Sequence, residues 1–259
     1  MRGLWTLCAV MLSVALGGCA TTGPDSTADT PAPTELSRFS SAKTDGELPG
    51  DWKLWSFSRL KKKTDYTLVV DDGRVCVRAR ADGAASGLRH RLDLDPQRFP
   101  LLTWRWKVPQ LIASADNSSR QKEDSPVRIM VSFEGDIDRL PLDDRLFFDK
   151  ARIFGQELPY ATLMYIWENR APVGTVIPST HTTRVQMIVA ASGPTRLGEW
   201  KTFERNIVED YRRAYGEEPG RIKAVAIMTD TDNTGEQTVA YYGDIAFRPR
   251  RTTATADPR

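Results

Sequence analysis

The sequence predicts a mainly β fold, an antiparallel β-sandwich or jelly roll, and three observations support this prediction. Short segments in which apolar and polar residues alternate fill most of the chain after residue 50. Turn-forming residues separate most of these segments. Strand-like and helix-like segments do not alternate regularly, so a parallel α/β sheet is not expected. We therefore expect a single sandwich domain over residues 51–249.

The expected strands begin with a hairpin. Residues 67–70 (TLVV) and 74–79 (RVCVRA) flank the turn sequence DDG. Cys76 lies in the second of these segments and is expected to be a small buried hydrophobe. The remaining expected strands are residues 101–108, 127–133, 161–167, 183–190, 224–229 and 239–247.

One amphipathic helix is predicted over residues 200–215, and a shorter helix over residues 143–154. Gly216 and Pro219 follow the first helix as stop signals. We expect this helix to lie across an edge or an open face of the sandwich. Its apolar residues recur four apart and would share one face: Phe203, Ile207, Tyr211 and Tyr215.

The N-terminal residues predict a bacterial lipoprotein. Arg2 precedes an apolar run over residues 7–16, and the sequence LGGC at residues 16–19 closes it, which is the layout of a secretory signal peptide. The run is shorter than the ~20 apolar residues that a membrane-spanning helix needs. In this interpretation residues 1–18 are removed and Cys19 carries the lipid. An ordinary cleaved signal with an incidental cysteine is the alternative.

The lipoprotein interpretation also predicts a location. Ala20 follows the lipid cysteine where Asp would favour retention at the inner membrane, so we expect attachment to the outer membrane, facing the periplasm. The membrane is then a partner through the N-terminal lipid. Residues 19–50 contain few apolar residues and are expected to form a flexible tether. Residues 250–259 are expected to form a disordered tail.

Composition excludes several classes of function. Lys and Arg total 36 and Asp and Glu total 34, so the overall charge gives no reason to expect a nucleic-acid partner. Two histidines argue against a His-rich zinc site. The sequence has no G-x-S-x-G, P-loop or H-E-x-x-H motif, so the common hydrolase, nucleotide-binding and zinc-protease signatures are absent.

The segment 227–235 (IMTDTDNTG) carries the densest polar signal. Asp230 and Asp232 alternate with a threonine and could point the same way at a strand end, and Asn233 follows them. Their oxygens are the hard ligands that Ca²⁺ accepts, so these three residues are the candidate metal ligands; no other cofactor is expected. The twelfth loop position is Tyr241 rather than Glu, which excludes an EF-hand. A capped β-turn without a ligand is the alternative.

Two further groups are candidates for a ligand site. Trp104 and Trp106 would share one face of a strand, while Arg105 and Lys107 share the other. The two indoles could form a platform for a sugar ring or another flat ligand, or they could fill the sandwich core. The second group would meet at one sheet edge if the strands that carry Arg128 and Trp167 are neighbours: Asp124, Arg128, Glu168 and Asn169.

Four of the acidic candidates would suit acid–base work on a glycosidic bond if two of them face each other at a suitable distance. Surface salt bridges are the alternative interpretation of the same residues. The candidate catalytic residues are Asp124, Glu168, Asp230 and Asp232.

Several of these segments together resemble one bacterial family. They are LTWRWKV at residues 102–108, DYRR at 210–213, AIMTDTDNTG at 226–235 and YYGDIAF at 241–247. On these segments the chain is similar to the domain-of-unknown-function family 3047, over about residues 52–247. The resemblance implies membership and carries no activity. By analogy of fold, the pattern is also similar to the galactose-binding-like β-sandwiches of carbohydrate-binding modules.

We expect a non-catalytic, envelope-anchored β-sandwich that binds a glycan or a similar polar ligand. A polysaccharide hydrolase of the envelope and a structural assembly factor that contacts other envelope proteins are the alternatives. The candidate ligand-binding residues are Trp104, Trp106, Asp124, Arg128, Trp167, Asp230, Asp232 and Asn233.

Overall fold

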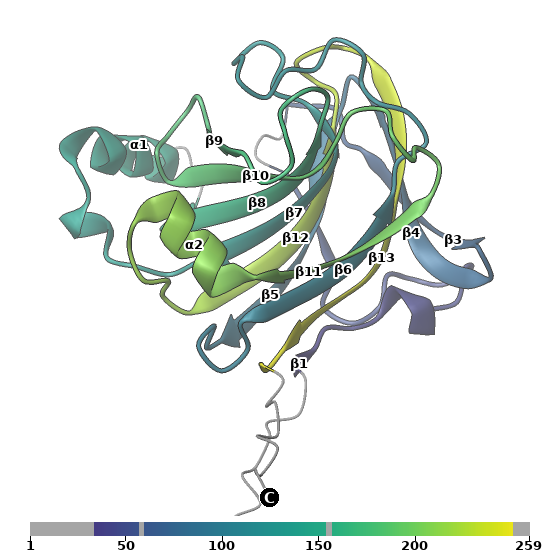
Figure 1. Cartoon of the computed structure of the whole chain (residues 1–259), viewed down its shortest axis with the longest axis horizontal. Coiled ribbons are helices and arrows are strands. Elements are labelled where there is room, and N and C mark those ends of the chain that lie inside the picture. Colours follow the sequence, from purple (N-terminus) through teal and green to yellow (C-terminus); the bar gives the residue numbers. More distant parts are fainter. Residues whose placement is uncertain (1–33, 57–59, 154–156, 251–259) are drawn as a thin grey trace, which may run out of the picture. The chain divides into compact units, whose positions relative to one another are not determined.

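The computed structural model describes residues 34–56, 60–153 and 157–250. These residues form two β-sheets that pack face to face, with few helices (Figure 1). The predicted mainly β sandwich is therefore confirmed.

The first sheet is antiparallel throughout. Its long last strand lies in the middle of the sheet and pairs with strands on both sides. The order is β11 (Trp200–Asn206), β6 (Leu101–Lys107), β13 (Gln237–Arg248), β4 (Arg74–Asp82) and β3 (Asp65–Asp71), and β1 (Thr34–Glu35) also pairs with β13.

The second sheet is mixed. Its pairs are antiparallel except that β10 runs parallel to β8, which departs from the purely antiparallel prediction. A parallel neighbour needs a crossover, and the segment between these two strands provides it and carries β9. The order is β2 (Lys53–Trp55), β5 (Ala85–Leu94), β12 (Ile222–Asp230), β7 (Ser125–Phe133), β8 (Ala161–Glu168), β10 (Val185–Ser192) and β9 (Val176–Pro178).

The main core lies between the two sheets, and alternation along each strand decides which side chains enter it. Along β6 the burial pattern alternates strictly: Trp104 and Trp106 are buried, and Arg105 and Lys107 between them are only partly so. Cys76 on β4 is buried and unpaired, as expected. Aromatic side chains fill much of this core, among them Trp52, Phe133, Tyr165, Trp167, Tyr211, Tyr242 and Phe247.

The prediction of a helix over residues 200–215 is correct only for its second half. Helix α2 spans Ile207–Tyr215, whereas residues 200–206 form strand β11, which pairs with β6. Phe203 fits a strand as well as a helix, and it enters the core and stacks on Trp104 with 4.9 Å between ring centroids. Residues 200–206 therefore form a strand, because they gain hydrogen bonds to the edge of β6 and the Phe203–Trp104 contact, although the spacing of their apolar residues also fits a helix.

The start and end of α2 follow from its capping residues. The Asn206 side chain accepts hydrogen bonds from the backbone N–H groups of Val208 and Glu209, and it donates to the Glu209 carboxylate at 2.6 Å. Gly216 ends the helix in the left-handed conformation, with φ of 69°. The shorter predicted helix is confirmed as α1 (Leu142–Ile153); residue 154 lies outside the described residues.

The predicted tether over residues 19–50 is wrong for its last part. From Thr34 onward the chain belongs to the folded body: β1 pairs with β13, and Leu36 and Phe39 are buried. Phe39 packs on Trp52, with 4.8 Å between ring centroids. Two apolar side chains in the right places anchor a segment whose average composition is polar.

The predicted signal peptide, Cys19, the first part of the predicted tether and residues 251–259 lie outside the described residues. In the part of the chain that the structure describes, no helix is long and apolar enough to cross a membrane.

Candidate functional site

The predicted aromatic platform is not on the surface. Trp104, Trp106 and Trp167 are 2%, 0% and 0% exposed, so they belong to the core and cannot bind a ligand from solvent. The Trp167 indole donates to the Gly193 carbonyl at 3.0 Å. The alternative that we gave for Trp104 and Trp106, filling the core, is the one that the structure supports.

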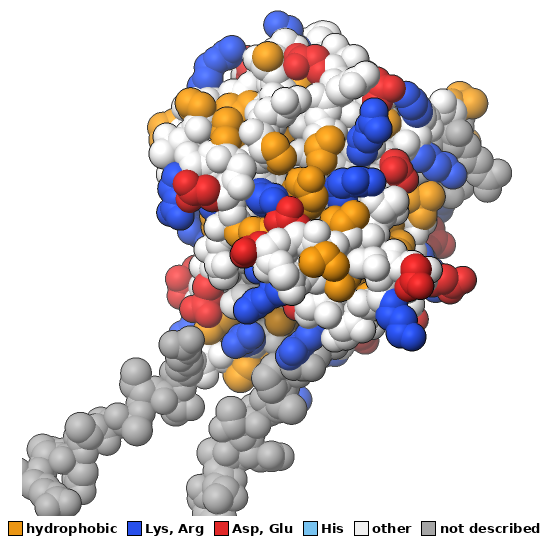
Figure 2. Space-filling model, turned by 90° about the vertical axis from the view of Figure 1, so that its right-hand side faces the viewer, with side chains coloured by type: hydrophobic (Ala, Val, Ile, Leu, Met, Phe, Trp, Pro, Cys, Tyr) orange, Lys and Arg blue, Asp and Glu red, His pale blue; other side chains and the backbone are white. Residues whose placement is uncertain are grey.

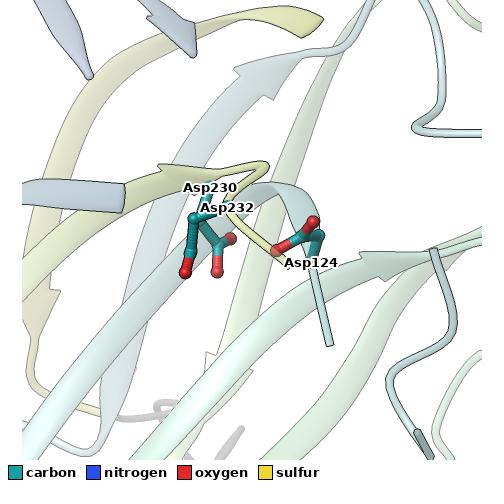
Figure 3. A group of neighbouring side chains, drawn as sticks. All are labelled: Asp124, Asp230 and Asp232. Carbon is teal, nitrogen blue, oxygen red and sulfur yellow. The ribbon is translucent and has the colours of Figure 1, made fainter. Parts of the chain in front are cut away.

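Three of the predicted acidic residues come together at one end of the sandwich. Asp124, Asp230 and Asp232 each place a carboxylate oxygen within 4.8 Å of the other two. Figure 3 shows Asp230 and Asp232 side by side at the end of β12, with Asp124 facing them from the segment that leads into β7. Asp230 and Asp232 were predicted to lie together, whereas Asp124 comes from a different predicted group; we call the three residues the acidic cluster.

Arg128 holds Asp230 in a two-pronged ion pair. Its Nε donates to Oδ1 at 2.9 Å and its Nη2 donates to Oδ2 at 3.0 Å, and both residues are buried. Nη2 also donates to the Glu123 carbonyl at 2.7 Å. The remaining guanidinium nitrogen, Nη1, lies against the sulfur atoms of Met164 and Met187, which belong to a second apolar cluster.

Burial dominates the protonation behaviour of Asp230. Desolvation, assisted by the negative charge of Asp124, raises the pKa of Asp230 to about 6, although Arg128 and the backbone N–H of Ser125 favour the ionised form. The negative charge of Asp230 raises the pKa of Arg128 against the opposing effect of burial. The guanidinium is therefore a fixed cation beside a carboxyl group that accepts a proton readily.

The other members of the acidic cluster also have protein partners. Asp124 accepts hydrogen bonds from the backbone N–H groups of Asn233 and Thr234, at 3.3 and 2.7 Å. Asp232 pairs with Lys61. The Asn233 side chain donates to the Arg120 carbonyl at 3.4 Å.

The contacts of the acidic cluster join segments that are distant in sequence: Asp124 bonds to the loop at residues 233–234, and Asp232 bonds to Lys61. Three carboxylate oxygens at this spacing could bridge a divalent ion, since Ca²⁺ prefers oxygen ligands. Arg128 and Lys61, however, already neutralise two of the three charges. Calcium binding stays a prediction.

Glu168 and Asn169, at the end of β8, serve as turn anchors. Glu168 accepts hydrogen bonds from the backbone N–H groups of Arg170 and Ala171. Asn169 donates to the carbonyls of Ile112 and Ala115 at 2.8 and 3.0 Å. Because β7 and β8 are neighbours, these residues lie at the same edge as Asp124, as expected. Their polar groups bind the protein's own backbone.

A different group of residues lies on the outer face of the first sheet, which we call the concave face. The register places four side chains in one row across four strands: Trp200 on β11, Lys107 on β6, Tyr241 on β13 and Arg78 on β4. All four are partly exposed. A parallel row two residues away contains Arg80 on β4 and Val239 on β13.

One contact shows that this face curls inward. Asp71 lies on β3 and Trp200 on β11, the two edges of a path of five strands, which a flat sheet would hold about 19 Å apart at ~4.8 Å per strand. The Trp200 indole nevertheless donates to the Asp71 carboxylate at 2.8 Å. Cys76, which points to this side of β4, is completely covered.

The same carboxylate holds Lys107 in place. Burial would raise the pKa of Asp71, but the hydrogen bonds that Lys107 and Trp200 donate outweigh burial, and the pKa lies below its ordinary value. The Lys107 ammonium also lies 4.5 Å from the centre of the Tyr241 ring, and the Arg105 guanidinium lies 4.2 Å from that of Trp200.

Gly243 makes room for Arg105 on this face. A Cβ atom at position 243 would lie 2.4 Å from both Cγ and Nε of Arg105, which is too close for any side chain. The absence of a side chain at position 243 thus leaves room for the Arg105 side chain, whose guanidinium lies over the Trp200 ring. Both large cationic side chains beside Trp200 are therefore fixed before any ligand arrives.

A hollow of about 330 Å³ opens beside Tyr241. Arg78 and Arg80 contribute its positive charge, and among the described residues neither of them forms an ion pair. Figure 2 views the side of the molecule on which the right-hand strands of Figure 1 lie and shows basic, acidic and apolar side chains intermingled there. The hollow is lined by Arg78, Arg80, Ala81, Gln110, Gln237, Thr238, Val239 and Tyr241.

These residues are not among those predicted from the sequence, for identifiable reasons. The alternation over residues 101–108 draws attention to Trp104 and Trp106, whereas Arg105 and Lys107 lie on the opposite face. Trp200 was predicted at the start of a helix. The available signal was the alternation of Arg78 with Arg80 in a strand whose other face is apolar, since paired cations on a strand mark a solvent face.

No curated protein matches the chain. Among solved structures, the chain is similar to an endo-1,4-β-glucanase named CelB2, with 10% identity, coverage of 74% of this chain and 90% of that one, and a TM-score of 0.39. It is also similar to a family 30 carbohydrate-binding module of a Clostridium thermocellum cellulosomal cellulase, with 10% identity, coverage of 80% and 91%, and a TM-score of 0.35. A third is endoglucanase 3 of Trichoderma harzianum, from family GH12, with 6% identity, coverage of 77% and 98%, and a TM-score of 0.37.

One family model matches most of the chain. It covers residues 50–246, nearly the whole of the two-sheet body described above, and it includes the strands that carry the acidic cluster and the concave face. This match agrees with the resemblance found in the sequence. The chain therefore belongs to the family described as "Protein of unknown function (DUF3047)".

Proposed function

We propose that this protein is a non-catalytic, lipid-anchored envelope protein that binds a glycan on the concave face. The observation that carries the proposal is the row formed by Trp200, Lys107, Tyr241 and Arg78 in register across four strands. Sugar rings present apolar C–H faces and a rim of hydroxyl groups. A row that alternates aromatic rings with cationic donors matches both parts.

The concave face is also built before binding. Asp71 fixes Trp200 and Lys107, and Gly243 leaves room for Arg105, whose guanidinium lies against the Trp200 ring. Side chains that are already ordered lose little conformational entropy when a ligand binds. The hollow of about 330 Å³ beside Tyr241 lies within the ~300–1,000 Å³ range of small-molecule sites.

The hydrolase alternative has no comparable support. It needs two carboxyl groups that face a bound sugar across a cleft. The acids predicted for that role are held by backbone N–H groups, by Arg128 or by Lys61. The assembly-factor alternative rests on no specific contact either.

The anchoring part of the proposal rests on the signal-like residues 1–18 and on Cys19. Radiolabelled palmitate should enter the full chain and should fail to enter the variant Cys19→Ser, which should also leave the membrane fraction. Equal labelling of both chains would contradict the lipidation proposal and would leave the glycan proposal untouched.

The binding part is tested by aromatic truncation. A glycan array followed by calorimetry on the full chain should find a ligand whose affinity falls at least tenfold in Trp200→Ala and in Tyr241→Ala, a loss of about 1.4 kcal/mol for each ring contact. Trp55→Ala is the matched control, because Trp55 lies on the second sheet with the Arg89 guanidinium 5.8 Å from its ring centre. Loss of binding in the control, with normal binding in the two variants, would place the site on the other sheet.

A further inference from the structure

We infer that the glycan bound on the concave face is acidic, with a carboxylate on at least one sugar ring. This inference rests on the proposed function and names the class of ligand. The charges of the face support it. The row and its immediate neighbours hold four cations, Arg78, Arg80, Arg105 and Lys107. Two acids offset them in part: Asp71 pairs with Lys107, and Asp82, which pairs with Lys62, also feels the charge of Arg80.

The molecule itself shows that a carboxylate suits this face. Asp71, brought over by the curl of the β3–β4 hairpin, accepts hydrogen bonds from both Lys107 and Trp200. The Lys107 ammonium also lies close to the Tyr241 ring. The protein therefore fills one anion position with its own side chain.

The corresponding position on the other side of Tyr241 is open. Arg78 lies directly across from Tyr241 on β4, as Lys107 does on β6. Asp65 lies across from Arg80 on the neighbouring strand, but among the described residues it forms no ion pair with Arg80. A sugar ring on Tyr241 would bring its carboxylate to Arg78 and Arg80.

Arginine is the side chain suited to this role. Its planar guanidinium donates two parallel hydrogen bonds to a carboxylate and stays charged at every accessible pH. Both arginines line the hollow, which has two glutamines among its other polar groups. Among the described residues neither guanidinium forms a direct ion pair, although Asp82, whose pKa is lowered chiefly by Lys62, lies near enough to Arg80 for that charge to lower the pKa further. An acidic glycan would supply the direct partner that a neutral glycan lacks, so it is the better match.

The test compares acidic and neutral oligosaccharides on the full chain by calorimetry at pH 7 and low salt. Oligogalacturonate should bind at least tenfold more tightly than its neutral methyl ester, and 0.5 M NaCl should remove most of that difference. Arg78→Gln should weaken oligogalacturonate about tenfold and leave the neutral ester unchanged. Arg91→Gln, on the second sheet, is the matched control and should change neither affinity.

Two further variants separate charge from geometry. Arg78→Lys keeps the charge without the guanidinium fork and should recover only part of the affinity. Asp71→Asn removes the internal carboxylate and should strengthen oligogalacturonate binding about threefold. Thermal melting of each variant checks that the fold is intact.

The outcomes distinguish the inference from the proposal beneath it. Equal affinity for both oligosaccharides, abolished by Trp200→Ala but not by Arg78→Gln, would overturn the acidic ligand and keep the glycan site. Binding of sulfated but not carboxylated oligosaccharides would also overturn the carboxylate. Tighter binding of single-stranded oligothymidylate than of any glycan would overturn both, as would binding of no oligosaccharide.

Discussion

Removing either partner of the Arg128–Asp230 pair should destabilise the protein, and the two losses should depend on pH in opposite directions. Both side chains are buried, so an unpaired survivor costs about 3–5 kcal/mol. In Asp230→Asn the survivor is a guanidinium, which cannot lose its charge. In Arg128→Met the survivor is a carboxyl group, which can take up a proton, and the new methionine joins Met164 and Met187.

The magnitudes follow from the raised pKa of Asp230, about 6 when folded against ~3.9 when unfolded. Between these two values Asp230 binds more protons in the folded state than in the unfolded state. The contribution of Asp230 to the free energy of unfolding is therefore highest below pH 4 and falls as the pH rises. The wild type should lose about 1.3 kcal/mol between pH 5 and pH 7 from this group. Without Arg128 the pKa of Asp230 rises further, and in the limit of full protonation the loss is about 2.7 kcal/mol. Asp230→Asn has no such dependence.

The assay is chemical denaturation of the two full-length variants at pH 5, 6 and 7, with unchanged slopes as the check on a common unfolding reaction. All other titrating groups are shared, so their effects largely cancel in the difference between the variants. Arg128→Met should gain about 2.7 kcal/mol relative to Asp230→Asn as pH falls from 7 to 5. The double variant should be more stable than Asp230→Asn alone, because it removes the unpaired guanidinium. A difference between the variants that does not change with pH would refute the reasoning.

Three more expectations concern the core, the helix cap and the acidic cluster. Trp104→Ala should lower the free energy of unfolding by about 3–5 kcal/mol, because it leaves a cavity in the core. Trp104→Phe should lower it much less, because the buried indole N–H has no partner among the described residues. Equal losses in the two variants would indicate a hydrogen-bond partner for that N–H. Asn206→Ala should cost about 1 kcal/mol and Asn206→Ser only a few tenths, measured by denaturation, since the side chain caps two N–H groups. The melting temperature should be the same in EDTA and in 1 mM Ca²⁺ if Arg128 and Lys61 already balance the acidic cluster, and a rise with Ca²⁺ of several degrees would show that an ion displaces them.

The sequence predicted the sandwich because most of its strands alternate cleanly or lie between turn residues. It missed β5, whose segment ASGLRHRLDL begins with small residues. A Cβ atom at Gly87 in that strand would lie 2.5 Å from the Ile227 carbonyl oxygen. The small residues of β5 therefore allow its backbone to approach β12 closely, and this requirement does not produce the alternation of apolar and polar residues that marks the other strands. It also placed a helix over β11, because Phe203 satisfies both periods and only the open edge of β6 decides between them.

The acidic cluster was partly predictable and the concave face was not. Asp230 ends β12 and Asp232 lies two residues further on, in the turn that follows, so their nearness in sequence was enough to predict that they lie together. The row on the concave face depends on the register of four strands and on the curl of the sheet that brings Asp71 to Trp200. Neither can be predicted from the residue pattern of a single segment. Composition also hid Leu36 and Phe39, whose burial depends on where the chain passes and not on how polar its neighbours are.

The position of β13 has a consequence for how the molecule is made. The strand is the last of the described strands, yet it is the central member of the first sheet, between β6 and β4, and it also pairs with β1 through Thr34 and Phe247. During synthesis, the edges of β4 and β6 that pair with β13 keep unpaired backbone N–H and C=O groups until residues 237–248 have been made. Such edges invite pairing between chains. A nascent chain that stops short of this strand should therefore aggregate, and its first sheet can close only after residues 237–248 have been synthesised.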